Sequence, residues 1–348
     1  VTQGMDAPDA VVNNNMAAVM DIAGFNYRPH KYQENYKKLP QQIVLGSETA
    51  STVSSRGVYK FPVTRQWMKK YDDHQSSSYD VESCSWSNLP EDDFIQHEDL
   101  PYCIGEFVWT GFDYLGEPTP YYTDWPSHSS LFGIIDLAGL PKDRYYLYRS
   151  HWNKEQETLH ILPHWNWEEG QEIDLWAYYN NADEVELFVN GVSQGTKSKE
   201  KDIYHVSWRV RYVPGTIKAV SRKDGKVVLE KEIHTAGEPA GIRLTADRTT
   251  ISADGTDLGF VTVEVVDKDG NLCPNADNLI NFDIDGNAFI AGVDNGCAYS
   301  MERFKDNKRK AFYGKCLVVL QNNGSKGKAK LTATADGLTT TSLTVRAK

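Results

Sequence analysis

The chain shows two patterns of hydrophobic and polar positions, and the pattern changes near residue 152. Before that point, short apolar runs alternate with amphipathic stretches. The apolar runs predict buried strands at residues 20–25, 43–45 and 104–109. The amphipathic stretches predict helices at residues 31–38, after Pro90, and at residues 142–151. Strands that alternate with helices indicate a parallel sheet with crossover connections, so we expect an α/β unit here.

After residue 152 the apolar positions alternate with polar ones at a period of two, which is typical of half-buried strands. We predict strands at residues 173–177, 185–189, 260–265 and 328–334. Turn-forming pairs such as Asn190-Gly191, Asp224-Gly225 and Asp269-Gly270 separate the runs. Turns at a spacing of roughly 8 to 12 residues favour two immunoglobulin-like β-sandwiches, joined by a linker at residues 235–239. The expected domains are residues 1–152, 153–236 and 237–348.

Composition and charge narrow the class of protein. Of the 348 residues, 40% are hydrophobic and 24% are charged, as in globular proteins with substantial cores. The formal net charge of −11 repels phosphate backbones and anionic lipid head groups, so we expect no nucleic-acid or membrane partner. No run of about 18 apolar residues occurs that would span a bilayer. The chain begins Val1-Thr2-Gln3-Gly4, which reads like the interior of a longer sequence, so we expect a fragment or a processed piece.

Neither the cysteines nor the acidic residues show the spacing of a metal site. The five cysteines include no C-x-x-C pair and no nearby histidine at zinc-site spacing. We expect them to be free, small core residues, although a single bridge among Cys273, Cys297 and Cys316 stays open. The aspartates between residues 267 and 294 do not match a calcium loop and fit β-turns instead. We therefore expect no metal.

Chemically useful side chains follow the three predicted strands of the first part. Asn26 and Tyr27 follow the first strand, Glu48 the second, and Trp109 and Asp113 the third. In a parallel α/β barrel the strand ends face a common mouth, so these side chains are expected to converge. An indole that stacks on an apolar ring face, together with a carboxylate, an amide and a phenol, suits a sugar.

Four sequence motifs contain or adjoin these residues. They are DIAGFNY at residues 21–27, GSETAS at 46–51, FVWTGFDYLGEP at 107–118 and FGIIDLAGLPKD at 132–143. In wording, order and spacing they resemble the second half of glycoside hydrolase family 2, the family of β-galactosidases, β-glucuronidases and β-mannosidases. The resemblance implies a C-terminal portion of a (β/α)8 TIM barrel at residues 1–152. Residues 161–237 and 238–348 resemble, less specifically, the β-sandwiches that follow the barrel in long bacterial members.

The resemblance also implies a role for each candidate residue. Glu48 matches the catalytic nucleophile of the family, which forms a covalent glycosyl-enzyme intermediate that water then hydrolyses with retained configuration. Tyr27 matches the tyrosine that hydrogen-bonds this carboxylate and helps to hold it ionised. Trp109 resembles the tryptophan at the floor of the sugar subsite, and Asn26 and Asp113 are expected to bind sugar hydroxyls.

The chain departs from the family pattern at the second catalytic acid. Retaining hydrolysis needs another carboxyl group about 5 to 5.5 Å from the nucleophile. In the family it is a glutamate that follows an asparagine upstream, but no Asn-Glu pair precedes Glu48, and the one earlier glutamate, Glu34, follows Gln33. We expect the acid/base in a missing N-terminal half and expect this chain alone to be inactive. Half a barrel leaves strand edges unpaired, so either that half or a second copy is the expected partner.

The resulting functional prediction is a portion of a retaining exo-β-glycosidase that acts on non-reducing terminal sugars without an organic cofactor, with β-galactosidase as the preferred activity. β-Glucuronides and β-mannosides are alternative substrates, and a noncatalytic carbohydrate-binding or adhesion protein is the rival. Arg28, His30 and Lys31 could bind a uronic carboxylate, but loop cations are usually solvated. Trp165 and Trp167 are expected to pack between the barrel and the next sandwich and not to form a sugar platform. The resemblance to glycan-degrading bacterial proteins implies a periplasmic or secreted parent.

Overall fold

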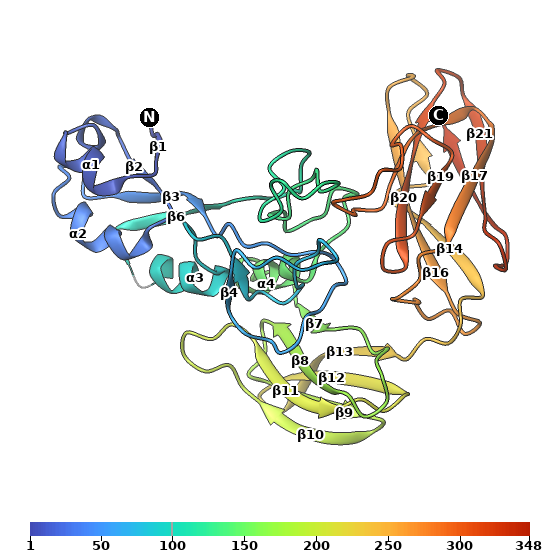
Figure 1. The fold of residues 1–348 in the computed structure, drawn as a ribbon, viewed down its shortest axis with the longest axis horizontal. Coiled ribbons are helices and arrows are strands. Elements are labelled where there is room, and N and C mark those ends of the chain that lie inside the picture. Colours follow the sequence, from blue (N-terminus) through green and yellow to red (C-terminus); the bar gives the residue numbers. More distant parts are fainter. Residues whose placement is uncertain (99) are drawn as a thin grey trace.

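The computed structural model describes residues 1–98 and 100–348, and most of its regular structure is β-sheet. Figure 1 shows three parts along the chain: a first region (residues 1–152), a middle β-unit (residues 159–234) and a C-terminal β-unit (residues 241–347). In this view the middle β-unit lies below the first region and the C-terminal β-unit stands to the right. Among the described residues, none of the helices has the length and apolar character needed to cross a membrane.

The first region is built on a parallel sheet with the strand order β1-β2-β3-β6. Its strands are β1 (Gly4–Met5), β2 (Ala23–Asn26), β3 (Val44–Thr49) and β6 (Cys103–Val108). The α-helices of this region are α1 (Pro8–Asn13), α2 (Tyr32–Tyr36), α3 (Pro90–Glu98) and α4 (Asp143–Trp152). The predicted alternation of parallel strands and helices is confirmed. The pattern did not indicate the 3-10 turns η1 (Ala17–Val19) and η2 (Pro29–Lys31) or the strand pair β4 (Gln66–Trp67) and β5 (Glu82–Ser83).

Strand β3 is longer than the apolar run indicated. The prediction ended this strand near Leu45 and left Glu48 in the loop that follows, which is wrong, because β3 continues to Thr49 and includes Glu48. The polar residues stay in strand conformation because parallel pairing continues on both sides. Asn26 is the partner of Glu48 in β2, and Val108 is the partner of Thr49 in β6.

A small apolar core and one glycine fix the spacing of these strands. The core contains Met5, Val12, Phe25, Tyr32 and Val44. Gly24 lies where β2 passes closest to its neighbours: a Cβ at this position would lie 2.6 Å from the Gln3 carbonyl oxygen and 3.0 Å from Ser47 Cβ. Real Cβ atoms do not come this close to a carbonyl oxygen. The glycine therefore permits the close approach that sets the distance between Asn26 and Glu48 at the strand ends.

Both β-units consist of two mainly antiparallel sheets around a shared apolar core. The sheets of the middle β-unit have the orders β10-β9-β12-β13 and β11-β8-β7. Their strands are β7 (Leu159–Leu162), β8 (Glu172–Tyr179), β9 (Glu184–Val189), β10 (Val192–Lys197), β11 (Val206–Arg211), β12 (Thr216–Lys223) and β13 (Lys226–His234).

The sheets of the C-terminal β-unit have the orders β14-β16-β20-β18 and β15-β22-β21-β17-β19. Their strands are β14 (Gly241–Ala246), β15 (Thr250–Ile251), β16 (Leu258–Val266), β17 (Leu279–Gly286), β18 (Ala288–Asp294), β19 (Lys308–Lys310), β20 (Lys315–Asn322), β21 (Gly327–Thr334) and β22 (Thr341–Ala347). Each of the four strands predicted after residue 152 is confirmed, as β8, β9, β16 and β21.

The predicted turn residues form hairpins. Asn190 and Gly191, with φ of 48° and 79°, connect β9 to β10, and Asp224 and Gly225, with φ of 49° and 72°, connect β12 to β13. A two-residue turn with positive φ at both positions matches the right-handed twist of the strands it joins. Asparagine, aspartate and glycine tolerate that conformation best, so these turns were readable from the sequence.

The two tryptophans that follow the first region, Trp165 and Trp167, both have packing roles. Trp165 is fully buried in the core of the middle β-unit, and its indole nitrogen donates to the Val213 carbonyl oxygen (3.1 Å). Trp167 packs edge-to-face on Phe61 of the first region, with ring centroids 5.3 Å apart. Trp167 thus joins the two parts of the chain as predicted, whereas the hydrogen bond of the Trp165 indole lies within the middle β-unit, and neither ring forms an exposed platform.

Replacing Gly24 by alanine tests the close approach of the strands. The added methyl group forces β1 or β3 to move, and overpacking of this kind costs about 1 to 3 kcal/mol. We expect Gly24→Ala to lower the unfolding temperature in calorimetry. The control is Gly259→Ala in β16, where the nearest atom to the new Cβ is Ile251 Cγ2 at 3.5 Å, an ordinary contact. Equal stability of the two variants would contradict the assignment.

Candidate functional site

A bulge at the ends of β2 and β3 brings the candidate residues together. Phe25 pairs with Gly46, but the next residue, Asn26, pairs with Glu48, so Ser47 is the extra residue. Bulges redirect side chains at the point where they interrupt a ladder. Here the Ser47 hydroxyl donates to Asn26 Oδ1 (2.8 Å), and Asn26 Nδ2 donates to Glu48 Oε2 (3.1 Å).

The half-buried Glu48 carboxylate has a different donor at each oxygen. The Tyr27 hydroxyl donates to Oε1 (2.5 Å), and the Asn26 amide donates to Oε2. Both donors are neutral, so they fix the orientation of the carboxylate without cancelling its charge. Three of the residues predicted from the sequence are thus in direct contact.

The position of Tyr27 beside Glu48 is fixed by burial and by a backbone hydrogen bond. Its side chain is buried, and its backbone nitrogen donates to the Glu48 carbonyl oxygen (2.7 Å). Tyr27 and Arg28 have φ of 56° and 55°, a left-handed conformation that costs non-glycine residues about 1 to 3 kcal/mol each and that clusters at functional sites. Burial, reinforced by the Glu48 charge, raises the pKa of Tyr27 well above its ordinary value. The phenol therefore keeps its proton and remains a donor at neutral pH.

Ser51 and Trp86 also belong to this group, although the sequence analysis did not single them out. The Ser51 hydroxyl lies within hydrogen-bond distance of the Tyr27 hydroxyl, and the Trp86 carbonyl oxygen accepts from Arg28 Nη1 (2.6 Å). Ser51 lies inside the word GSETAS and was therefore within reach of a sequence argument. Trp86 comes from the long segment between β3 and α3, and no local pattern links it to the strand ends.

Trp109 follows β6 directly, and its backbone nitrogen donates to the Thr49 carbonyl oxygen (2.8 Å). Its half-buried ring stands edge-to-face to Tyr114, with centroids 6.0 Å apart. The Tyr114 hydroxyl donates to Glu117. Burial, with Glu117 and Glu48 acting in the same direction, raises the pKa of Tyr114 above its ordinary value. Tyr114 is therefore a second protonated phenol close enough to Glu48 to feel its charge, and it too was not singled out from the sequence.

Asp113 has different surroundings, and they do not support the expectation that it binds a sugar hydroxyl. It is buried; Oδ1 accepts from the Gly133 backbone nitrogen (2.7 Å), and Oδ2 forms an ion pair with Lys142 Nζ (2.7 Å). Burial raises the pKa of Asp113 to about 6 even though Lys142 opposes the shift. Because both carboxylate oxygens are engaged inside the protein, Asp113 acts as a structural residue in this geometry.

The cations near the first strand are engaged by neighbouring acids. Arg28 forms an ion pair with Asp6 (3.5 Å) and Lys31 forms one with Asp9 (3.0 Å). His30 is exposed. These contacts give no support to a bound uronic carboxylate at this position.

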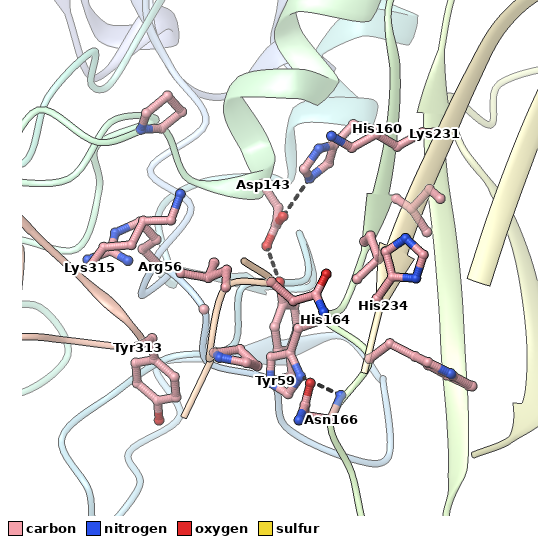
Figure 2. A pocket seen from close by; sticks show the side chains of 18 of the residues that line it. Arg56, Tyr59, Asp143, His160, His164, Asn166, Lys231, His234, Tyr313 and Lys315 are labelled. Atoms are coloured by element: carbon pink, nitrogen blue, oxygen red, sulfur yellow. Dashed lines mark hydrogen bonds and ion pairs between the residues drawn. The ribbon is translucent and has the colours of Figure 1, made fainter. Parts of the chain in front are cut away.

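A cavity of about 450 Å³ lies elsewhere, where the three parts of the chain meet (Figure 2). Its lining includes Tyr59, Asp143, His164, Lys231 and Lys315. Asp143 accepts from the Tyr59 hydroxyl (2.7 Å) and pairs with His160 Nε2 (2.6 Å), and burial lowers the pKa of His164 to about 4. None of the predicted site residues lines this cavity. Its central carboxylate is already paired, so we place the candidate site at the half-buried Glu48.

The described residues offer no obvious metal centre. All five cysteines are free thiols, and four of them are buried. Among residues 1–98 and 100–348, no group of three or more histidine, cysteine or acidic side chains is arranged to hold a metal ion.

An oriented carboxylate beside two phenols, an amide and an indole can bind a sugar and attack or stabilise its anomeric carbon. Among the described contacts of Glu48, none is with a second carboxyl group. The site as described therefore provides one of the two carboxyl groups that glycoside hydrolysis requires.

Comparisons with known proteins define the class to which this geometry is related. Residues 242–344 match the family model described as Glycoside hydrolase family 2 C-terminal domain 5, and residues 170–229 match a domain of unknown function, DUF4982. The sequence and the fold together make the chain similar, over nearly its whole length, to the C-terminal part of glycoside hydrolase family 2 proteins. The resemblance inferred from the four sequence motifs is confirmed.

Two curated relatives show how similar the sequences are. The β-galactosidase BoGH2A of Bacteroides ovatus is 54% identical over 346 residues, which cover 97% of this chain and 40% of the relative. A β-glucuronidase of Formosa agariphila is 34% identical over 163 residues, which cover 46% of this chain and 16% of the relative. The chain thus spans well under half the length of these relatives.

Solved structures agree. A β-glycosidase from Bacteroides vulgatus superposes with a TM-score of 0.86 at 28% identity, covering 99% of this chain and 50% of that one. A glycosyl hydrolase family 2 member from Bacteroides cellulosilyticus superposes with a TM-score of 0.78 at 29% identity, covering 100% of this chain and 44% of that one.

Replacing Lys142 by methionine tests the structural role of Asp113. The change leaves a buried carboxylate without its cation, which typically costs about 3 to 5 kcal/mol. We expect Lys142→Met to lower the free energy of unfolding in urea by that amount. Lys268→Met is the control, because Lys268 pairs with Asp269 in an exposed position and its loss should change little. A Lys142→Met protein as stable as the control would refute the role.

Proposed function

We propose that this chain is the C-terminal portion of a retaining exo-β-glycosidase of glycoside hydrolase family 2, and that β-galactosidase is its preferred activity. The observation that carries the proposal is the Glu48 carboxylate, oriented by Tyr27 and Asn26 at the end of a parallel strand. The 54% identical relative from Bacteroides ovatus is named a β-galactosidase, which supports the same substrate class.

In this mechanism Glu48 attacks the anomeric carbon and forms a glycosyl ester while the bond to the aglycone oxygen breaks. The leaving oxygen takes a proton from a second carboxyl group. The resulting carboxylate then takes a proton from water, whose oxygen attacks the anomeric carbon and breaks its bond to Glu48, so that Glu48 is restored and the configuration is retained. Tyr27 and Asn26 keep the nucleophile oriented between the two steps. Trp109 supplies an apolar face for the sugar ring.

We further propose that residues 1–152 form the C-terminal part of a TIM barrel, and that residues 153–236 and 237–348 are two immunoglobulin-like β-sandwich domains. Four parallel strands in sequential order, with helices between them, support the first assignment. Two sheets that share one core in each β-unit support the second.

The second carboxyl group, in this proposal, belongs to an N-terminal half of the same protein. The relatives are longer than this chain, and large apolar side chains of β6, Ile104 and Phe107, are 53% and 65% exposed. Exposed apolar residues on an unpaired edge strand usually mark a surface that another element covers. The isolated chain would then hydrolyse no glycoside, because general acid catalysis alone typically contributes about 10² to 10⁴-fold.

A neutral sugar fits the described residues better than a uronic acid, because Arg28 and Lys31 are engaged by Asp6 and Asp9. β-Glucuronides stay the alternative substrate, since the Formosa agariphila relative is named a β-glucuronidase. A panel of chromogenic β-galactosides, β-glucuronides and β-mannosides distinguishes them.

Trapping the covalent intermediate tests the nucleophile. In the full-length protein a 2-deoxy-2-fluoro-β-galactoside should form a stable ester with Glu48. Trypsin releases residues 39–56 as one peptide, in which Glu48 is the sole acidic residue, so a mass increase of this peptide locates the label without ambiguity. Glu48→Gln should abolish both the label and turnover. Labelling of any other peptide would refute the assignment.

Removing one hydroxyl group tests the orientation of the nucleophile. Tyr27→Phe deletes the donor to Glu48 Oε1, and a hydrogen bond to a charged group contributes about 1.5 to 3 kcal/mol. We expect kcat/KM to fall by roughly 10- to 150-fold. Tyr32→Phe is the matched control: Tyr32 is also buried, and in the described structure its hydroxyl has no hydrogen-bond partner. Equal rates for the two variants would contradict the role of Tyr27.

A further inference from the structure

A segment of the C-terminal β-unit reaches back onto the first region. It comprises residues 294–304 between β18 and β19, and it is visible in Figure 1 as the orange-red stretch that extends toward the green loops. The Ala298 carbonyl oxygen accepts from the backbone nitrogens of His128 (3.0 Å) and Ser129 (3.2 Å). Ala298 is buried in the apolar cluster against which Trp109 and Tyr114 pack.

The start of this segment is rigid within its own unit. Arg309 is fully buried, and its guanidinium donates to Asp294 Oδ1 (3.0 Å) and Asn295 Oδ1 (2.9 Å). Asn295 Oδ1 also accepts from the Cys297 backbone nitrogen (3.1 Å). The contacts therefore present a fixed backbone to the first region.

Arg56 of the first region binds this backbone, and we call its contacts with Asp136 and Asn295 the Arg56 clamp. It is buried, its Nε donates to Asp136 Oδ2 (2.6 Å), and its Nη2 donates to the Asn295 carbonyl oxygen (2.8 Å). In Figure 2 Arg56 lies on the side of the cavity that carries Tyr313 and Lys315 of the C-terminal β-unit. One guanidinium thus joins the two parts through a buried, charge-assisted contact.

Asp136 directly follows two residues that are hydrogen-bonded to the backbone after Trp109. The backbone nitrogens of Ile134 and Ile135 donate to the carbonyl oxygens of Thr110 (3.0 Å) and Gly111 (3.1 Å). These hydrogen bonds, together with the backbone from Asp136 back to Ile134, therefore connect residues 294–298, through Arg56, to the residues that follow Trp109.

We propose that residues 294–298 of the C-terminal β-unit, acting through Arg56 and Asp136, position Trp109 and thereby set the affinity for the sugar. Arg56 is a positioning residue, because among its described contacts none is with Glu48 or its donors. The inference rests on the proposed function in assigning Trp109 to the sugar subsite. It adds that a β-unit remote in sequence shapes that subsite.

A pair of glycine variants isolates the clamp. Gly296 (φ 75°) lies against Asp136, and a Cβ there would be 2.0 Å from Asp136 Oδ2, whereas Gly337 (φ 74°) has no atom within 4 Å of its Cβ position. Both alanine variants carry the same left-handed strain, but only Gly296→Ala displaces Asp136. In the full-length protein we expect Gly296→Ala to lower kcat/KM by about 10- to 100-fold, mainly through a higher KM. Gly337→Ala should retain the wild-type KM.

Two further measurements separate positioning from stability and from the proposed function. Hydrogen exchange at the Ile134 and Ile135 amides should be faster in Gly296→Ala than in Gly337→Ala at equal unfolding temperatures. Arg56→Lys, which keeps a cation opposite Asp136, should raise KM less than Arg56→Met. Equal KM and equal exchange in the two glycine variants would overturn the inference. Wild-type protein that hydrolyses no glycoside would refute the proposed function, and faster exchange would still support the mechanical coupling.

Discussion

The orientation of the Glu48 carboxylate depends on one irregularity in a parallel ladder, the bulge at Ser47. In a regular strand Ser47 and Glu48 would point to opposite faces of the sheet, and only one of them would share a face with Asn26. The bulge lets both contact Asn26, and the left-handed turn at Tyr27 then brings a buried phenol to the second carboxylate oxygen. The contacts that this turn creates offset the energetic cost of its strained backbone.

Buried cations hold the irregular segments around this carboxylate. The stretches after β3 and β6 contain little regular structure, so many of their carbonyl groups need partners other than a ladder. Arg144, fully buried, donates to the carbonyl oxygens of Thr52, Phe132 and Gly133, and Lys142 donates to that of Ser54 while it pairs with Asp113. Such groups are costly to bury, but once fully satisfied they specify one arrangement of the loops.

The β-units take part in this arrangement. The middle β-unit packs on the first region through aromatic rings, including the contact of Trp167 with Phe61, and through polar contacts such as that of His160 Nε2 with Asp143 (2.6 Å). The C-terminal β-unit makes a polar contact, with Arg56 bound to Asp136 and to the Asn295 carbonyl oxygen. Apolar contacts tolerate small shifts, whereas a buried charged hydrogen bond fixes distance and direction. The C-terminal β-unit makes its charged contact beside Asp136, next to the backbone that is hydrogen-bonded to the residues after Trp109, and it is therefore suited to hold that backbone in register.

The sequence by itself determined the alternation of strands and helices, the period-two strands, the hairpin turns at Asn190-Gly191 and Asp224-Gly225, and the set of Glu48, Tyr27 and Asn26. These features depend on local periodicity, on the conformations that particular residues tolerate, or on compact sequence words. Only the tertiary structure decided that β3 includes Glu48, that Asp113 is sealed against Lys142, and that Trp86 and Tyr114 join the group. Apart from the ring contact between Trp109 and Tyr114, these outcomes depend on contacts between residues far apart in the chain, and no local pattern encodes which distant carbonyl, cation or ring will be the partner.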